Sequence, residues 1–224
     1  MADFAALREE MVRRQIEGRG LRDPHLLAAM RAVPREAFVP APLAGHAYED
    51  SPLPIEADQT ISQPYIVALM IEAAAIAPGG KVLEIGAGSG YAAAVIGRIA
   101  GAVIAIERHG ELAALAAERM KRLGCANVRI VHGDGSRGLP EEAPFDAILA
   151  AASGSHVPEC LKHQLAIGGT LVMPIGEPGA VQSLVAVTRT GDEAYRTEDL
   201  GAVRFVPLIG EEGWNEAGER PMPS

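Results

Sequence analysis

A glycine-rich loop behind an apolar strand, in the run from Val82 to Tyr91, most constrains what this chain can fold into. Gly86, Gly88 and Gly90 follow directly after the apolar strand residues. Glycine has no Cβ and tolerates positive φ, so such a loop lets the backbone approach a ligand closely. The pattern predicts a nucleotide-type pocket at the carboxyl end of a parallel strand. Taken alone, the three glycines also fit a purely structural turn.

The spacing of these glycines indicates which cofactor class the pocket takes. A dinucleotide fingerprint needs G-x-G-x-x-G, and Tyr91 occupies the position of its third glycine. The remaining pattern fits a cofactor that carries an adenosine but no phosphates, namely S-adenosyl-L-methionine. Tyr91 therefore disfavours the alternative of a nicotinamide-dependent oxidoreductase.

The composition is that of one α/β domain with a net negative charge. The chain has 224 residues, of which 48% are hydrophobic, a formal charge of −9 and a pI near 5.2. This length suffices for a sizeable core, and the charge argues against a nucleic-acid partner. Two cysteines are compatible with a reducing cytosol. Because no apolar signal core and no 18-residue apolar run is present, we expect a cytoplasmic protein without a membrane span.

Two isolated features carry little functional information. Cys160 and His163 stand at helical i, i+3 spacing, which is more typical of packing than of metal binding, so we expect no metal. Trp214 lies in a polar tail and either pins that tail to the domain or is simply exposed.

The order of apolar segments predicts a single domain in two parts. We expect residues 1–78 to form a helical cap with an active-site segment, and residues 79–224 to form a doubly wound, cofactor-binding core. The predicted strands are 81–85, 102–106, 128–131, 145–150, 170–173, 183–188 and 202–208. The predicted helices are 4–16, one capped by Asp23, 66–76, 91–99, 111–123 and 157–167. This alternation is typical of a mainly parallel sheet covered on both faces, here with an antiparallel C-terminal edge.

Three acids fall at successive strand ends, where ligands bind in a doubly wound sheet. Glu107, at the end of the second core strand, suits a ribose diol, because a carboxylate accepts hydrogen bonds from two hydroxyls. Asp134, after the third strand, suits an adenine amino group. Glu84 holds the glycine loop through its backbone N–H groups, or faces the positive end of the methionine moiety, or does both.

A second tract, Asp58 to Tyr65, precedes a predicted buried helix. Ser62 stands where an N-cap belongs, and Pro64 fits the first turn. On local grounds Ser62 is therefore a capping serine, worth about 1 kcal/mol. Since no Gly-x-Ser-x-Gly elbow surrounds it, a hydrolase nucleophile is not indicated.

The chain strongly resembles the protein-L-isoaspartate O-methyltransferase family over nearly its full length. The tract Gln59-Thr60-Ile61-Ser62-Gln63-Pro64 looks like the signature of that family. The resemblance also rests on Met11–Ile16, Arg19–Asp23, Val33–Pro40, Ala47–Asp50, Glu84–Tyr91, Gly133–Gly135, Ala143–Ile148 and Arg204–Leu208. It implies a Rossmann-like, S-adenosyl-L-methionine-dependent methyltransferase fold.

The same resemblance implies a reaction. The methyl group is transferred to the free α-carboxylate of an L-isoaspartyl residue in a damaged protein, with S-adenosyl-L-homocysteine as product. The resulting ester collapses to a succinimide, which can reopen to aspartate. Isoaspartyl-containing peptides and proteins are thus the expected partners, and we expect a monomer.

The resemblance also assigns roles to residues, and it reverses the local interpretation of Ser62, which matches the active-site serine. Cofactor contacts are expected from Gln59, Thr60, Ile61, Glu84, Gly86, Gly88, Gly90, Glu107, Arg108, Asp134 and Gly135. The substrate groove is expected from Ile61, Ser62, Val206, Pro207, Leu208 and Ile209. One departure is Glu56-Ala57-Asp58, where many bacterial relatives have glycines, which adds side chains and charge near the substrate mouth.

Two further functions remain as alternatives to isoaspartyl methylation. One is methylation of RNA or of a small molecule, which the charge of −9 and the Thr60–Ser62 tract disfavour. The other is a non-catalytic sensor of an adenosine ligand, which the intact Ser62 and glycine loop disfavour.

Overall fold

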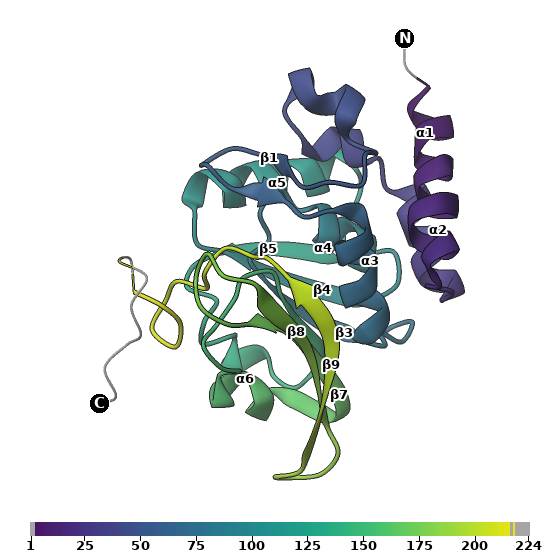
Figure 1. The fold of residues 1–224 in the computed structure, drawn as a ribbon. Helices are drawn as coiled ribbons and strands as arrows, with labels where there is room; N and C mark the ends of the chain where they lie inside the picture. The colour runs from purple at the N-terminus through teal and green to yellow at the C-terminus, as the bar shows by residue number, and fades with distance from the viewer. Residues whose placement is uncertain (1–2, 216, 218–224) are drawn as a thin grey trace.

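Within the residues that the structure describes, seven strands form one mixed sheet through the middle of the molecule (Figure 1). This computed structural model describes residues 3–215 and 217. The strand order is β5-β4-β3-β6-β7-β8-β9. The bounds are Lys81–Ile85 (β3), Ala102–Glu107 (β4), Val128–His132 (β5), Phe145–Ala150 (β6), Leu165–Ile175 (β7), Gln182–Arg189 (β8) and Tyr195–Val203 (β9).

The strands from β5 to β7 are parallel, and the last two reverse direction. β3 pairs in parallel with β4 and β6, whereas β8 is antiparallel to β7 and to β9. Parallel strands are buried on both faces and consist of nearly continuous apolar runs, as β3, β4 and β6 do. The predicted Rossmann-like sheet with a mixed C-terminal edge is confirmed.

Helices cover the two faces of the sheet. Val82 and Leu83 are neighbours in β3, yet they belong to separate hydrophobic clusters, because alternate side chains of a strand point to opposite faces. The cluster of Val82 is the larger, and side chains of most helices join it; that of Leu83 takes in Leu161 of α6. The helices are α1 (Phe4–Met11), α2 (Pro24–Ala32), α3 (Pro64–Ala73), α4 (Tyr91–Ile96), α5 (Gly110–Arg122) and α6 (Glu159–His163).

The N-terminal helices begin and end where their sequence predicts. Asp23 caps α2, because its carboxylate accepts the backbone N–H of His25 at 2.7 Å and of Leu26 at 2.9 Å. Pro24 then fills the first position, where a missing N–H costs nothing. After α1 the chain passes through a π-helical turn (Val12–Ile16) and a 3-10 turn (Glu17–Arg19), and it stops at Gly20 with φ of +99°.

A short antiparallel hairpin connects this helical part to α3. Its strands are β1 (Leu53–Pro54) and β2 (Thr60–Ile61), with Leu53 paired to Ile61. Two 3-10 helices, Arg35–Phe38 and Ala41–His46, precede it. The hairpin places the Gln59–Ser62 tract immediately before α3.

The strand predicted over 202–208 is wrong. The last strand is β9, which covers the polar run from Tyr195 to Val203 and pairs with β8. Beyond Val203 the chain leaves the sheet, and Val206 is 39% exposed. Residues 206–208 instead pair with Ser153, which follows β6.

The helix predicted over 157–167 is wrong beyond His163. The α-helix spans only Glu159–His163, and Leu165 already begins β7. Because the apolar residues from Leu165 to Ile167 fit either a helix or a strand, periodicity alone does not separate the two.

Candidate active site

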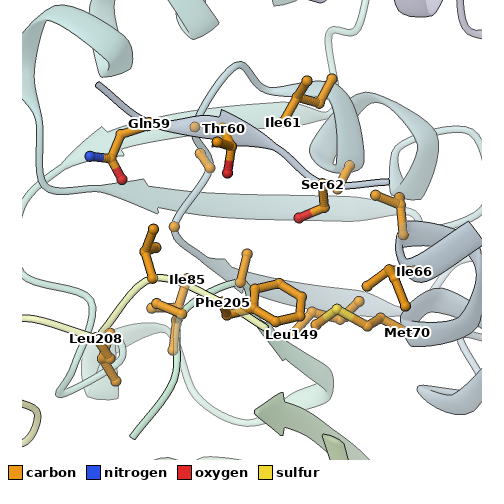
Figure 2. A pocket seen from close by; sticks show the side chains of 18 of the residues that line it. Gln59, Thr60, Ile61, Ser62, Ile66, Met70, Ile85, Leu149, Phe205 and Leu208 are labelled. Carbon is orange, nitrogen blue, oxygen red and sulfur yellow. The ribbon is translucent and has the colours of Figure 1, made fainter. Parts of the chain in front are cut away.

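The main cavity opens at the carboxyl ends of β3, β4 and β6. It has a volume of about 1040 Å³. The chain runs outward from β3 through β4 to β5 and then returns to β6 on the other side of β3, so this is the point where the strand order reverses. Ligands of open α/β sheets bind in the crevice at such a point. The hairpin residues 59–62 and α3 form one wall, and residues 202–209 form another (Figure 2).

The glycine loop lines this cavity in the strained backbone conformation that glycine permits. Gly86, Gly88 and Gly90 have φ of +83°, +53° and +87°. A Cβ on Gly90 would lie 3.0 Å from Met120 Cε and 3.2 Å from Ala116 Cβ. Gly90 therefore lets the start of α4 pack against α5, whereas Gly86 and Gly88 contribute to the cavity wall.

The carboxylate of Glu107 holds the glycine loop. Its Oε2 accepts the backbone N–H of Gly88 at 2.8 Å, and its Oε1 accepts that of His109 at 2.9 Å. The side chain is buried and lines the cavity. Each carboxylate oxygen has further acceptor capacity, so this anion can also accept hydrogen bonds from a diol.

Glu84 is a buried carboxyl that lines the same cavity. Among the described residues, its Oε2 finds no hydrogen-bond partner. Burial first, and then the nearby charge of Glu107, raise the pKa of Glu84 to about 8. Of the two interpretations of Glu84, the loop-holding one is not what the structure displays, because Glu107 receives the N–H of Gly88. One carboxyl oxygen of Glu84 is thus left without a partner, in a residue that lines the cavity.

The carboxylate of Asp134 contacts the C-terminal loop. Its Oδ1 accepts the N–H of Ser136 at 2.8 Å, and its Oδ2 accepts the N–H of Glu211 at 2.9 Å. Partial burial opposes ionisation, but these backbone donors outweigh it and lower the pKa of Asp134. Asp134 is not among the residues that line the cavity, whereas its neighbour Gly135 is. A cofactor contact of Asp134 stays a prediction. In the structure, the Asp134 carboxylate connects the loop after β5 to the C-terminal loop through its hydrogen bonds with Ser136 and Glu211.

Gly135 and Arg108 both line the cavity. Their contacts with a cofactor stay predictions. Gly135 is required for close packing, because a Cβ there would lie 2.7 Å from Cγ2 of Ile85. Arg108 directly follows the end of β4, beside Glu107.

Ser62 lies at the cavity wall opposite the sheet. Figure 2 shows the hydroxyl oxygens of Thr60 and Ser62 directed into the space between the hairpin and Phe205, while Ile61 points away from it. The local interpretation of Ser62 as a helix cap is wrong, because the N-cap of α3 is Gln63 and no side-chain cap is described there. The Ser62 hydroxyl is thus free for a ligand.

Arg35 holds the Ser62 backbone from behind. This arginine is fully buried, and its Nη2 donates to the Ser62 carbonyl oxygen at 2.8 Å. Its Nε donates to the Ala47 carbonyl at 2.7 Å, and its guanidinium carbon lies 4.8 Å from the centroid of the Tyr91 ring. We did not predict a site role for Arg35 from the sequence, where the only signal was that it falls within the Val33–Pro40 block.

The predicted substrate residues Val206, Pro207, Leu208 and Ile209 also line the cavity. Backbone hydrogen bonds to Ser153 hold this segment: Ser153 donates its N–H to Val206 and accepts that of Leu208, both at 2.8 Å. The indole N–H of Trp214 also donates to the Ser153 carbonyl at 2.9 Å. Trp214 is 2% exposed, so it pins the tail.

Within residues 3–215 and 217, no group of three His, Cys, Asp or Glu side chains could hold a metal ion. None of the helices there is long and apolar enough to cross a membrane.

Comparison with known proteins agrees with this geometry. A family model described as protein-L-isoaspartate(D-aspartate) O-methyltransferase matches residues 6–213. A protein of Rhodopseudomonas palustris (strain HaA2), named protein-L-isoaspartate O-methyltransferase 1, is 60% identical over 218 residues. That match covers 97% of this chain and 89% of the relative.

Two solved structures are similar to this chain over more than nine-tenths of its length. One is described as a protein-L-isoaspartate O-methyltransferase, with a TM-score of 0.81 and 31% identity over 92% of this chain and 66% of that chain. The other, from Plasmodium falciparum, is described as such an enzyme in complex with S-adenosyl-L-homocysteine. Its TM-score is 0.78, with 28% identity over 93% of this chain and 99% of that chain.

Proposed function

This chain belongs to the protein-L-isoaspartate(D-aspartate) O-methyltransferase family, and we propose that Ser62 and the glycine loop together direct its methyl transfer. The acceptor is the free α-carboxylate of an L-isoaspartyl residue, and the donor is S-adenosyl-L-methionine. The observation that carries the proposal is that Ser62, Glu84 and Glu107 line one cavity, with the glycine loop between them.

The residues present fit the donor. The glycines at 86 and 88 keep the backbone open to a ligand, and the orphaned Oε2 of Glu84 suits a cationic group. Glu107 suits the ribose hydroxyls. Gln59, Thr60, Arg108 and Gly135 line the same cavity, and Ile61 reaches it without directing its side chain into it. Gly90 and Asp134 support the site indirectly. Gly90 lets the glycine loop pack against α5, and Asp134 accepts a hydrogen bond from the backbone N–H of Glu211.

When bound, the sulfonium of the donor supplies an activated methyl group. The acceptor carboxylate has a pKa near 4 and is already ionised at neutral pH, so no general base is needed. The sulfur–methyl bond breaks as the methyl–oxygen bond forms, and the sulfonium becomes a thioether without any proton transfer.

The task of the protein is then to align the reacting groups and exclude water. Ser62 donates a hydrogen bond to one carboxylate oxygen and leaves the other free to attack. Productive alignment needs the reacting atoms about 3–3.5 Å apart. Ser62 is therefore the residue on which turnover depends, and Arg35 sets its position through the Ser62 carbonyl.

Substrate selection follows from backbone geometry. An isoaspartyl linkage carries an extra main-chain methylene. Residues 206–209 line the same cavity as Ser62, so their backbone can bind the main chain of a peptide whose carboxylate reaches Ser62. Backbone hydrogen bonds ignore side chains, so we expect tolerance of different flanking sequences. The partners that we propose are isoaspartyl-containing peptides and damaged proteins of the cytoplasm. We propose that the enzyme binds them as a monomer.

A paired peptide assay tests this function. Two peptides that differ only in an isoaspartyl or an aspartyl linkage are incubated with the protein and methyl-labelled donor. Label in the isoaspartyl peptide alone supports the proposal. Equal labelling of both peptides, or labelling of RNA or small molecules instead, contradicts it. Donor binding without transfer to any peptide would indicate an adenosine-ligand sensor.

A further inference from the structure

An ion pair ties the hairpin that leads to Ser62 to the helix behind the glycine loop. Glu56, at the tip of the hairpin, contacts Arg119 of α5, with Oε1 and Nη2 3.0 Å apart. The Arg119 side chain is only 9% exposed and that of Glu56 is 27% exposed. An ion pair this shielded from water is screened less than a surface pair.

The turn that carries Glu56 is conformationally strained. Ala57 and Asp58 have φ of +56° and +55°, in the left-handed region where residues other than glycine cost energy. The turn is closed by hydrogen bonds from Ile55 N–H to the Gln59 carbonyl at 2.9 Å and from Gln59 N–H to the Glu56 carbonyl at 3.3 Å. Such strain persists only where surrounding contacts over-determine the conformation, and the Glu56–Arg119 pair is one of those contacts.

Arg119 also reaches the glycine loop itself. Its Nη1 donates to the Ser89 carbonyl at 3.3 Å, between Gly88 and Gly90. The hairpin also lies close to the glycine loop here, since a Cβ on Gly88 would lie 3.6 Å from Cδ1 of Ile55. One guanidinium thus bridges the hairpin, which presents Ser62, and the loop, which faces the donor.

We propose that the Glu56–Arg119 ion pair is a latch that sets the spacing between the hairpin and the glycine loop. Glu56 and Arg119 are then positioning residues, and the inference rests on the proposed function of this cavity. The carboxylate of Glu56 is directed toward α5, where its contact with Arg119 braces the strained turn.

The test measures binding of S-adenosyl-L-homocysteine by calorimetry, together with kcat and KM for an isoaspartyl peptide. The variants are Glu56→Gln, Arg119→Met and the double variant. Glu159→Gln breaks an ion pair with Lys162 in α6 and serves as the control. We expect Glu56→Gln to weaken product binding about 5- to 20-fold and to raise KM, an effect within the range found for residues in direct contact. Glu159→Gln should match the wild type.

Two further results sharpen the test. The double variant should lose no more affinity than the weaker-binding single variant, and Arg119→Lys should recover part of the loss, because it keeps the charge. Unchanged affinity and KM in Glu56→Gln would overturn the latch, even if its melting temperature falls, since a purely structural pair changes only stability. Because product binding needs no peptide, a wild type that fails to methylate isoaspartyl peptides would contradict the proposed function and leave the calorimetric part of this test intact.

Discussion

Arg35 donates a hydrogen bond of 2.8 Å from its Nη2 to the backbone carbonyl oxygen of Ser62. A fully buried cation thereby holds the residue whose hydroxyl faces the cavity. The bond to the backbone leaves the side chain of Ser62 available for the acceptor. The position of the hydroxyl depends on the rigidity of a neighbour 27 residues earlier in the chain.

Replacement of Ser62 by alanine removes the hydroxyl and leaves the Arg35 contact in place. We expect kcat to fall about 100- to 1,000-fold, as for loss of one positioned hydrogen-bond donor, with the affinity for S-adenosyl-L-homocysteine nearly unchanged. Steady-state kinetics and calorimetry on the same preparation separate the two effects. An equal loss of affinity would show that Ser62 is a structural residue.

Arg35→Lys keeps the charge but cannot reach the Ser62 and Ala47 carbonyls with one planar fork. We expect kcat to fall more than product affinity does. Loss of one charged hydrogen bond should cost about 1.5–3 kcal/mol of unfolding free energy, measured by denaturant titration. Arg31→Lys, on the half-exposed surface of α2, is the control. Wild-type kcat in folded Arg35→Lys would exclude a positioning role.

Glu107→Gln keeps the shape of the side chain and removes its charge. The N–H of Gly88 and the ribose hydroxyls both lose a charged acceptor, so product binding should weaken about 10- to 100-fold. Glu111→Gln, at the exposed start of α5, should bind as the wild type does. Unchanged affinity in Glu107→Gln would refute the ribose contact.

The raised pKa of Glu84 makes stability depend on pH. In the unfolded chain this carboxyl ionises near its usual 4.5, whereas in the folded protein it holds its proton to about 8. The folded state therefore binds more protons between those values, and the contribution of Glu84 to unfolding free energy falls as pH rises through this window. Denaturant titrations at pH 5, 6, 7 and 8 should give a steeper decline for the wild type than for Glu84→Gln. Parallel pH dependences of the unfolding free energy for the two proteins would contradict the raised pKa of Glu84.

The same group should also make ligand affinity depend on pH. A ligand whose cationic group contacts ionised Glu84 must displace its proton below about pH 8. Affinity for S-adenosyl-L-homocysteine, which carries an amine, should then rise by up to roughly tenfold per pH unit toward pH 8. Calorimetry of Glu84→Gln should give no such rise.

Ala57→Gly relieves a left-handed residue in the hairpin turn. The relief should raise stability by about 1 kcal/mol and the melting temperature by roughly 2–4 °C. Ala117→Gly, at an exposed site inside α5, should instead destabilise by about 1 kcal/mol. A lower melting temperature for Ala57→Gly would show that the turn is not strained.

The core strands were predictable because their composition follows from their place in the sheet. β3, β4 and β6 are central, so both faces are buried and nearly every residue is apolar. β9 is an edge strand whose sequence, YRTEDLGAV, is mostly exposed. It shows no apolar alternation. The strand was predicted over 202–208 instead, because the residues that follow β9 are apolar.

Positions of the candidate site were predictable, but their connections were not. The carboxyl ends of the strands locate Glu84 and Glu107 at one edge of the sheet. Which of the two receives the Gly88 N–H depends on three-dimensional packing, and the sequence carries no sign of it. The Arg35–Ser62 bond likewise joins separate segments, and a buried arginine looks the same in the sequence as an exposed one.

Ser153 makes backbone hydrogen bonds to Val206 and Leu208 and accepts the indole N–H of Trp214. One wall of the cavity is thus fastened to the loop after β6 by a segment that follows β9. These two parts of the chain are distant in sequence, so the wall forms only when tertiary structure brings them together. A loosening of the Ser153 contacts would therefore widen the cavity without any change to the sheet itself.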